Sequence, residues 1–116
     1  MQSKWAKSGD FITTISCFSD LDHDFVNISD KLFMDDKKCA LGRIRMMAGL
    51  EIPEEKVYGD ICEVAAGEKG KRENEKEIIT YTPAGMGAAD VGVAFEAFEL
   101  ASKRNIGKEI ILAKEL

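Results

Sequence analysis

The chain has 116 residues, of which 45% are hydrophobic and 32% charged, and its sixteen basic and twenty-one acidic residues give a net charge of −5 at pH 7. That length suits one small domain, and the negative charge argues against a nucleic-acid-binding protein, which needs a basic face. No apolar run approaches the ~20 residues of a membrane span, and the N-terminal MQSKWAKSGDF lacks the apolar core of a signal peptide, so we expect a cytoplasmic protein that does not bind membranes.

The cysteines and the single histidine argue against a metal site. Cys17, Cys39 and Cys62 are widely spaced and form no CxxC motif, which excludes a zinc ribbon and a thioredoxin motif. His23 has no second histidine to pair with. We therefore expect no metal, and we interpret the cysteines as buried thiols of a reducing compartment.

The N-terminal half begins with two predicted strands. The run FITTISC, Phe11 to Cys17, is rich in β-branched and aromatic residues, which is typical of a buried strand. An acidic loop follows from Asp20 to Asp24, and Asp24 opens a short helix. The apolar run from Leu32 to Met34 predicts a second strand.

Two helices are expected next. Asp35 or Asp36 can cap the first by accepting hydrogen bonds from free backbone N–H groups, and its apolar face consists of Leu41, Ile44, Met47 and Ala48. Pro53 suits the first position of the second helix. The apolar spacing of that helix is set by Val57, Ile61 and Val64, and Gly67 suits its end.

The segment from 67 to 77, GEKGKRENEKE, offers almost nothing to bury and predicts a solvated loop. It lacks the G-x-x-x-x-G-K-[ST] spacing of a phosphate loop. A strand from Ile78 to Thr82 follows, then a helix from Ala88 to Arg104 and a short apolar tail from Glu109 to Leu112. The alternation of strands and helices predicts an α/β layer with a largely parallel sheet. The apolar stripe of the long helix consists of Val91, Ala94, Phe95, Phe98 and Ala101.

The turn PAGMGAAD, between the last strand and the long helix, imitates a dinucleotide-binding turn. The fingerprint is G-x-G-x-x-G with an acidic residue ~20 positions later. Gly85 and Gly87 match its first two glycines, but Asp90 stands at the third. A carboxylate there would cap the helix and repel a pyrophosphate. Glu109 lies at about the spacing of the ribose contact, which is a weak match. These residues favour a capped turn over a phosphate cradle.

The run VYGDICEVAAGEKGKRENEKEIITYTPAGMGAADVGVAFEAFELASKRNIGKEIIL resembles the C-terminal part of the ornithine cyclodeaminase/mu-crystallin family. WAKSGDFITTI and SDKLFMDD are similar to two upstream strands of that family, so the resemblance covers residues 5 to 112. The matching positions are Gly67, Gly70, Arg72, Glu77, Gly85, Asp90 and Ile106-Gly107.

The resemblance implies the second half of a Rossmann-like three-layer α/β domain, with short parallel strands and flanking helices. Residues 1–116 would form a single partial NAD(P)-binding domain without the upstream GxGxxG half. The family implies NAD(P)-dependent chemistry on amines and amino acids, in dimeric proteins. By this resemblance the chain looks like a fragment, the product of a truncated reading frame, or one piece of a split protein.

The resemblance also implies site residues. The turn at Pro83, Ala84 and Gly85 would approach the nicotinamide end of the cofactor. A second set of contacts would come from the loop after the first strand, through Ser16, Cys17 and Phe18. Without gaps, Ser16 and Cys17 fall where the family has Gly-Gly or similar, and Phe18 falls where ornithine cyclodeaminase has its catalytic aspartate.

Asp20 lies two positions after Phe18 and is the candidate catalytic residue, which could hold a substrate amine or move a proton. The alternative interpretation, which the residues favour, is a solvated acidic loop formed by Asp20, Asp22 and Asp24. For His23 the alternatives are a surface residue and a catalytic one, and for Cys17 they are a packed thiol and a residue that lines the nicotinamide pocket.

Two functions are therefore expected. The first is a fragment of an amine or amino-acid deaminase or dehydrogenase that uses NAD(H) or NADP(H). Alone, this fragment would be inactive and bind the cofactor weakly. The alternative is a non-catalytic dimerising or small-ligand-binding module of the mu-crystallin type. In either case an uncovered sheet edge predicts a partner, either a second copy or the missing N-terminal half.

Overall fold

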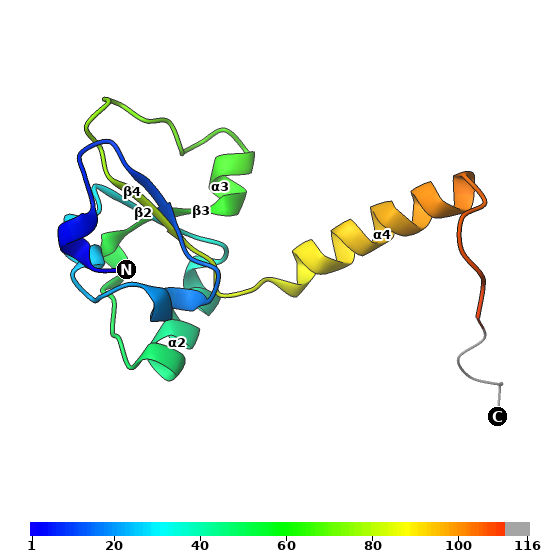
Figure 1. Ribbon diagram of the computed structural model, residues 1–116, viewed down its shortest axis with the longest axis horizontal. Helices are drawn as coiled ribbons and strands as arrows, with labels where there is room; N and C mark the ends of the chain where they lie inside the picture. The colour runs from blue at the N-terminus through cyan, green and yellow to red at the C-terminus, as the bar shows by residue number, and fades with distance from the viewer. Residues whose placement is uncertain (111–116) are drawn as a thin grey trace. The chain divides into compact units, whose positions relative to one another are not determined.

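The computed structural model describes residues 1–110, and the chain forms two compact units, Met1–Met86 and Gly87–Leu116 (Figure 1). No helix in the described part of the chain is both long and apolar enough to cross a membrane.

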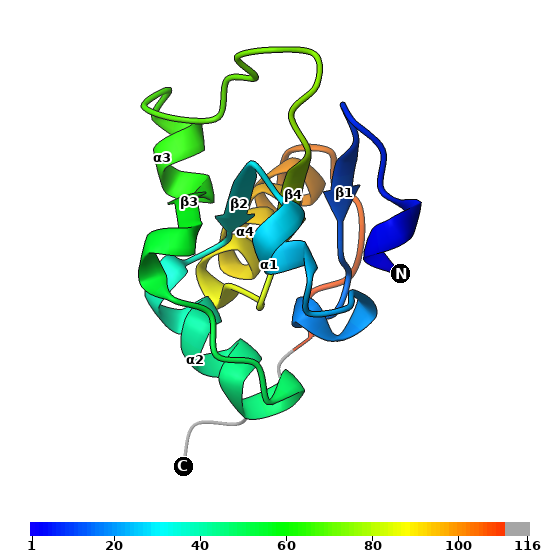
Figure 2. The same cartoon turned by 90° about the vertical axis from the view of Figure 1, so that its left-hand side faces the viewer.

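The first unit is built on a parallel sheet of four strands, which confirms the predicted α/β class. The strand order is β1-β4-β2-β3 (Figure 2). β4 lies between β1 and β2, and in the register Ile79 is the partner of both Phe11 and Lys31. The carboxyl ends of these three strands are therefore neighbours. The strands are β1 (Phe11–Thr13), β2 (Lys31–Met34), β3 (Val57–Asp60) and β4 (Ile79–Thr82).

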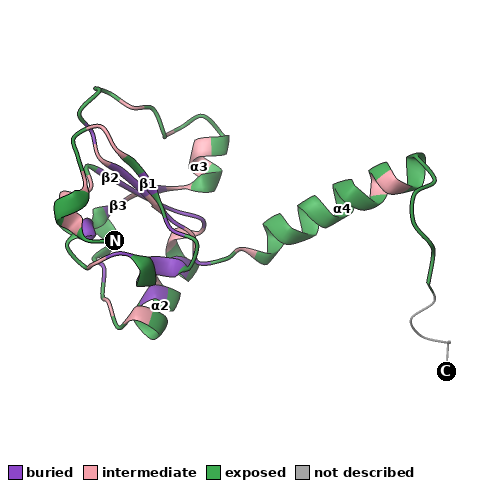
Figure 3. Cartoon of the chain, viewed as in Figure 1, coloured by how far each residue is buried: buried purple, intermediate pink, exposed green. Residues whose placement is uncertain are grey.

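The core of this unit lies where alternate strand residues meet α2 (Lys37–Ala48), α1 (Phe25–Ile28) and the short 3-10 helix η2 (Cys17–Asp20) (Figure 3). Burial of a large apolar side chain contributes roughly 1.5–3 kcal/mol relative to its exposure, so this cluster is the main stabilising feature of the unit. Its most deeply buried members are Phe18, Phe25, Leu32, Met34, Ala40 and Ile44.

The predicted helix after the second strand is α2, and Asp36 is its cap. The carboxylate of Asp36 accepts a hydrogen bond of 2.7 Å from the backbone N–H of Cys39, and Gly49, at φ +63°, ends the helix. Ile44 is buried as the spacing predicts, whereas Met47 is 59% exposed. Asp35 is left free for a different contact.

The helix predicted from Pro53 to Gly67 is wrong. A 3-10 turn, η3 (Glu54–Lys56), leads into strand β3, and only then does a short helix, α3 (Ile61–Ala65), begin. Pairing of β3 with β2 overrides the helical spacing of the apolar residues. The chain changes from strand to helix at Asp60, whose carboxylate forms a reciprocal capping box with Glu63.

The first strand is shorter than its sequence predicts. β1 ends at Thr13, and Cys17 has φ +42°, a left-handed conformation that cannot continue a strand. The remainder of the β-branched run forms a loop instead.

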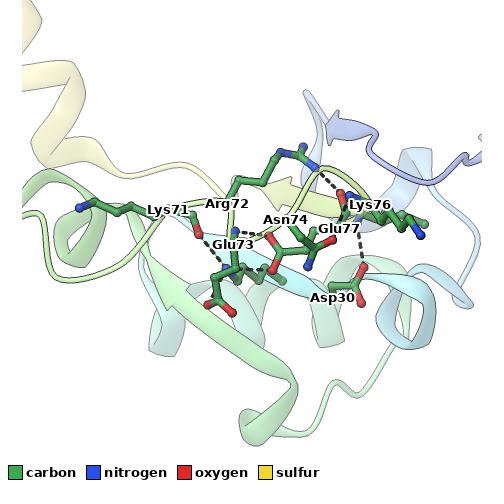
Figure 4. A network of polar contacts seen from close by, with 9 residues as sticks. Asp30, Lys71, Arg72, Glu73, Asn74, Lys76 and Glu77 are labelled. Atoms are coloured by element: carbon green, nitrogen blue, oxygen red, sulfur yellow. Dashed lines mark hydrogen bonds and ion pairs between the residues drawn. The ribbon is translucent and has the colours of Figure 1, made fainter.

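The loop from 67 to 77 has the predicted polar character, but it is fastened to the sheet. The Nζ atom of Lys31 lies 3.0 Å from Oε1 of Glu73 and 3.3 Å from Oε1 of Glu77, and Glu77 is only 7% exposed. Figure 4 shows the polar network around Glu77, in which the Arg72 guanidinium donates to the carbonyl oxygen of Glu77 at 2.5 Å. The expectation that this segment buries almost nothing therefore fails at Glu77.

The second unit contains the long helix α4 (Gly87–Lys103), within one residue of the predicted helix at each end. Lys103 lies 3.3 Å from Glu99, one turn earlier. None of the residues of α4 is buried in the structure. The predicted apolar tail begins in the described chain at Glu109, but its residues Ile111 and Leu112 lie outside the described residues.

Candidate functional site

A pocket of about 310 Å³ lies where the loops after β1 and β4 meet α2. The ends of β1 and β4 are joined by a buried hydrogen bond of 3.1 Å between the hydroxyl groups of Thr14 and Thr82. In parallel α/β sheets, ligands bind outside the carboxyl ends of the strands, so the location suits a binding site. The pocket is lined by Ile15, Ser16, Cys17, Arg43, Met47, Pro83, Ala84 and Gly85.

Five of the six residues predicted to contact a cofactor thus share one pocket, although they come from two distant segments of the chain. The sixth, Phe18, is not among the lining residues. It is 1% exposed and belongs to the hydrophobic core. The Phe18 side chain, in the short 3-10 helix η2, packs into the core and so anchors the loop after β1.

The first wall of the pocket is held by Asp20. One carboxylate oxygen of Asp20 accepts hydrogen bonds from the Ser16 hydroxyl at 3.0 Å, the Ser16 N–H at 3.2 Å and the Ile15 N–H at 3.4 Å. These bonds, that of the Ser16 hydroxyl first, lower the pKa of Asp20. The geometry therefore gives Asp20 a loop-organising role as an ionised carboxylate, and its catalytic role stays a prediction.

Cys17 lines the pocket next to Ser16. Its thiol is buried and contacts the Met47 sulfur at 3.8 Å. Its φ of +42° belongs to a region that glycine adopts readily and other residues rarely do. A strained backbone at such a place is typical of functional sites.

The second wall is the turn from Pro83 to Gly85, and Asp35 holds it. One oxygen of the Asp35 carboxylate accepts from the Ala84 N–H at 3.0 Å and from the Gly85 N–H at 2.6 Å. Asp35 is 4% exposed. The Arg43 guanidinium donates to the Ala84 carbonyl oxygen. Both the N–H groups and a carbonyl group of the turn are therefore hydrogen-bonded to side chains.

From the sequence, Asp35 was expected only as an alternative cap of the helix, and Arg43 was not singled out. The signal for Asp35 was present, because two aspartates follow β2 and a helix needs only one as its cap. Arg43 carries no comparable signal.

None of the acidic residues of the loop from Asp20 to Asp24 lines the pocket, and Asp20 acts on it only through its bonds to Ile15 and Ser16. Asp22, His23 and Asp24 are absent from the lining residues, and the Asp22 carboxylate instead accepts from the Ser3 N–H at 2.7 Å. Within residues 1–110, no group of three or more His, Cys, Asp or Glu residues is arranged to hold a metal ion.

The chain is similar in sequence to known dehydrogenases. No family model matches the chain. An alanine dehydrogenase of Archaeoglobus fulgidus is 30% identical over 117 residues, 95% of this chain and 36% of the relative. An N-((2S)-2-amino-2-carboxyethyl)-L-glutamate dehydrogenase of Staphylococcus aureus is 26% identical over 114 residues, 93% of this chain and 33% of the relative. The chain thus spans about a third of the length of these relatives.

Solved structures agree. An archaeal alanine dehydrogenase dimer with bound NAD superposes with a TM-score of 0.75 and 25% identity, over 97% of this chain and 37% of that one. The Thermococcus litoralis Δ1-pyrroline-2-carboxylate reductase, in complex with NADH and L-proline, gives a TM-score of 0.75 at 23% identity, covering 95% and 36%. A probable ornithine cyclodeaminase from Bordetella pertussis gives 0.67 at 20%, covering 91% and 36%.

The chain corresponds to a C-terminal portion of the ornithine cyclodeaminase/mu-crystallin family. Both the resemblance found in the sequence and the expected α/β fold are confirmed.

Proposed function

We propose that the chain forms the nicotinamide-side part of the site of an NAD(P)-dependent amine or amino-acid dehydrogenase or deaminase. The observation that carries this proposal is the convergence of Ser16, Cys17, Pro83, Ala84 and Gly85 on one pocket at the strand ends. The relatives support it, because they include dehydrogenases, and two of the superposed structures contain bound NAD or NADH.

The chemistry of the pocket fits a flat ring better than a phosphate. The N–H groups of Ser16, Ala84 and Gly85 are already bonded to Asp20 and Asp35, so a phosphate would have to displace a carboxylate from them. Apart from the Arg43 guanidinium, the lining side chains are apolar or small. A nicotinamide ring would supply hydride transfer there when bound, and the residues of this chain would orient the ring and exclude water.

The rest of the site would come from another polypeptide segment. β1 is the end strand of the described sheet and pairs with β4 alone, and Phe11 on β1 is 63% exposed. An unpaired parallel edge can accept a further strand. We expect a strand-GxGxxG-helix unit to add at β1 and to bring the pyrophosphate contacts that this chain lacks. The chain alone should bind the cofactor weakly and be inactive.

Titration with NADH, followed by nicotinamide fluorescence, tests the proposal. The purified chain is measured alone and with a separately expressed GxGxxG unit from a relative. Met47→Trp narrows the pocket and should abolish the binding that the mixture shows. Met46→Trp is the matched control, because Met46 is 77% exposed and does not line the pocket. Absence of binding in the mixture, or equal loss in both variants, contradicts the proposal.

A second candidate function is a non-catalytic ligand-binding or dimerising module. It is favoured by an apolar pocket of about 380 Å³ that is separate from the first and is lined in part by Phe11, Phe33, Ile79 and Tyr81. A folded oligomer by light scattering that ignores NADH, with or without the GxGxxG unit, would support this candidate over the first.

A further inference from the structure

The sheet of the first unit has a second apolar face, opposite the core, which the first unit covers only in part. Side chains alternate between the two faces of a strand, so Leu32 packs into the core whereas Phe33 lies on the other face. The parallel register places Tyr81 beside Phe33 and Phe11 beside Ile79. Phe11 is 63% exposed and Tyr81 is half-buried, so both aromatic side chains are accessible to a ligand.

The pocket of about 380 Å³, which we call the sheet-face pocket, lies on this face. Its walls are completed by Ile61 and Val64 of α3 and by Gly70 and Arg72 of the following loop. It shares no lining residue with the pocket at the strand ends. Cavities of roughly 300–1,000 Å³ with apolar walls and a few polar groups are typical of small-molecule sites, so the sheet-face pocket has the dimensions of a ligand site.

Arg72 gives this apolar pocket a positive charge. Neighbouring cations of the sheet and the loop are already paired, because Nζ of Lys31 lies 3.3 Å from Glu77 and Nζ of Lys69 lies 3.0 Å from Glu63. Within residues 1–110, no carboxylate lies within 4.0 Å of the Arg72 guanidinium. Its Nη1 donates to the Glu77 carbonyl oxygen (Figure 4). A half-buried guanidinium is thus held at the pocket without a counter-ion.

The chemistry of these walls defines the ligand. A guanidinium has five donors in a planar fork, and a carboxylate matches that fork. Burial raises the pKa of the Tyr81 hydroxyl, so this group stays protonated at neutral pH and is a further donor for an anion. The apolar side chains favour an alkyl body, whereas a small hydrated anion without one would gain nothing from them. A ligand with a positive charge would be repelled by Arg72.

We propose that the sheet-face pocket binds an aliphatic carboxylic acid, whose carboxylate pairs with Arg72 and whose alkyl chain lies against the aromatic side chains of the sheet. This site goes beyond the proposed nicotinamide-side function and does not depend on it. Because residues of this chain supply the walls, the pocket needs no GxGxxG unit for binding.

The test uses the full 116-residue chain and NMR titrations that follow the backbone amides of Phe33, Gly70 and Tyr81, with Gly85 as the reporter of the other pocket. Octanoate is the probe. Octylammonium has the same alkyl chain with a positive charge, and acetate has the carboxylate without the chain. We expect octanoate to shift the first three amides and not Gly85. Both other probes should bind at least about tenfold more weakly, since one loses the charge-assisted hydrogen bonds and the other the apolar burial.

Two substitutions separate ligand binding by Arg72 from support of the loop. Arg72→Lys keeps the charge and should retain part of the octanoate binding. Arg72→Gln keeps an N–H donor for the Glu77 carbonyl oxygen but loses the charge, and should weaken binding at least about tenfold. If Arg72 only supports the loop, Gln should preserve binding as well as Lys. Lys71→Gln is the control, because Lys71 is the adjacent residue, is exposed and does not line the pocket.

The absence of a shift with octanoate, or equal binding of octylammonium, would overturn the proposal. Loss of octanoate binding when the GxGxxG unit is added would also overturn it, and would assign this face to an interface with that unit. Shifts of the same amides when the protein alone is concentrated would assign the face to a second copy instead. The NADH titration reports on the other pocket, so its failure would leave this proposal intact.

Discussion

The buried carboxylate of Asp35 accepts a hydrogen bond of 2.6 Å from the backbone N–H of Gly85, 50 positions later in the chain. This bond joins the end of β2 to the turn after β4, and it sets the shape of one pocket wall. The Asp35 carboxylate also accepts hydrogen bonds from the N–H groups of Ala84 and Asp36. Both of its oxygens therefore have donors, which offsets the cost of burying the charge.

Asp35→Asn should destabilise the chain by about 1–3 kcal/mol, since an amide nitrogen would face N–H donors and leave buried groups unpaired. Asp36→Asn is the matched control and should change stability by only a few tenths of a kcal/mol, because asparagine caps a helix nearly as well as aspartate. Urea unfolding followed by circular dichroism measures both. Amide exchange at Ala84 and Gly85 should accelerate in the first variant only, and unchanged exchange there would refute the role of Asp35.

Gly85→Ala should cost about 1–3 kcal/mol of stability. Gly85 has φ +94°, and a Cβ added there would lie 3.0 Å from Nη1 of Arg43, so the variant combines backbone strain with displacement of the guanidinium. Gly49→Ala separates the two causes. Gly49 also has a positive φ, +63°, but nothing lies within 4 Å of its added Cβ. Equal losses of free energy of unfolding in the two variants would show that the Arg43 contact is unimportant.

Cys17→Gly should be more stable than Cys17→Ala by about 1 kcal/mol. Both substitutions remove the buried thiol, but only glycine relieves the positive φ of +42°. The difference between the two free energies of unfolding therefore isolates the strain. If alanine is the more stable variant, the left-handed backbone at this position is not a source of strain.

Stability should fall as the solution is acidified, in part through Glu77. Its pKa lies below the usual 4.5, first because the Glu73 N–H donates to the carboxylate and then because Lys31 does so. The group therefore contributes stability that is present above pH 4.5 and is lost as the pH falls through the lowered pKa. Glu77→Gln should flatten this acid limb in urea unfolding from pH 7 to pH 2, whereas Glu75→Gln, an exposed residue of the same loop, should not.

Lys31 should cause the free energy of unfolding to fall at alkaline pH. Burial by itself would lower the pKa of Lys31, but the hydrogen bonds to Glu73 and Glu77 outweigh burial and raise it above 10.5. Its contribution is present below pH 10.5 and is lost as the pH rises through the raised pKa. Lys31→Met should remove that alkaline loss, while Lys71→Met, which changes an exposed lysine, should preserve it.

Much of the fold followed from local sequence, and the errors have physical causes. The α2 and α4 helices were predicted because long periodic runs with caps or glycine ends specify them. The segment around Val57 and Ile61 fits helical spacing too, and only pairing with β2 makes part of it a strand. The cofactor loops were named from family resemblance, but the hydrogen bonds that shape them were not. Asp35 and Gly85 meet only through the tertiary fold, and no local pattern encodes that meeting.

The position of β4 has a consequence for how the protein folds. β1 has no partner in the described sheet except β4, so within residues 1–110 the strand β1 is paired only after β4 has been made. Because distant segments close slowly, we expect sheet assembly to be a late and cooperative event during synthesis. Both pocket loops follow these two strands, and the binding surface would therefore come into existence in a single step, with no partly built version before it.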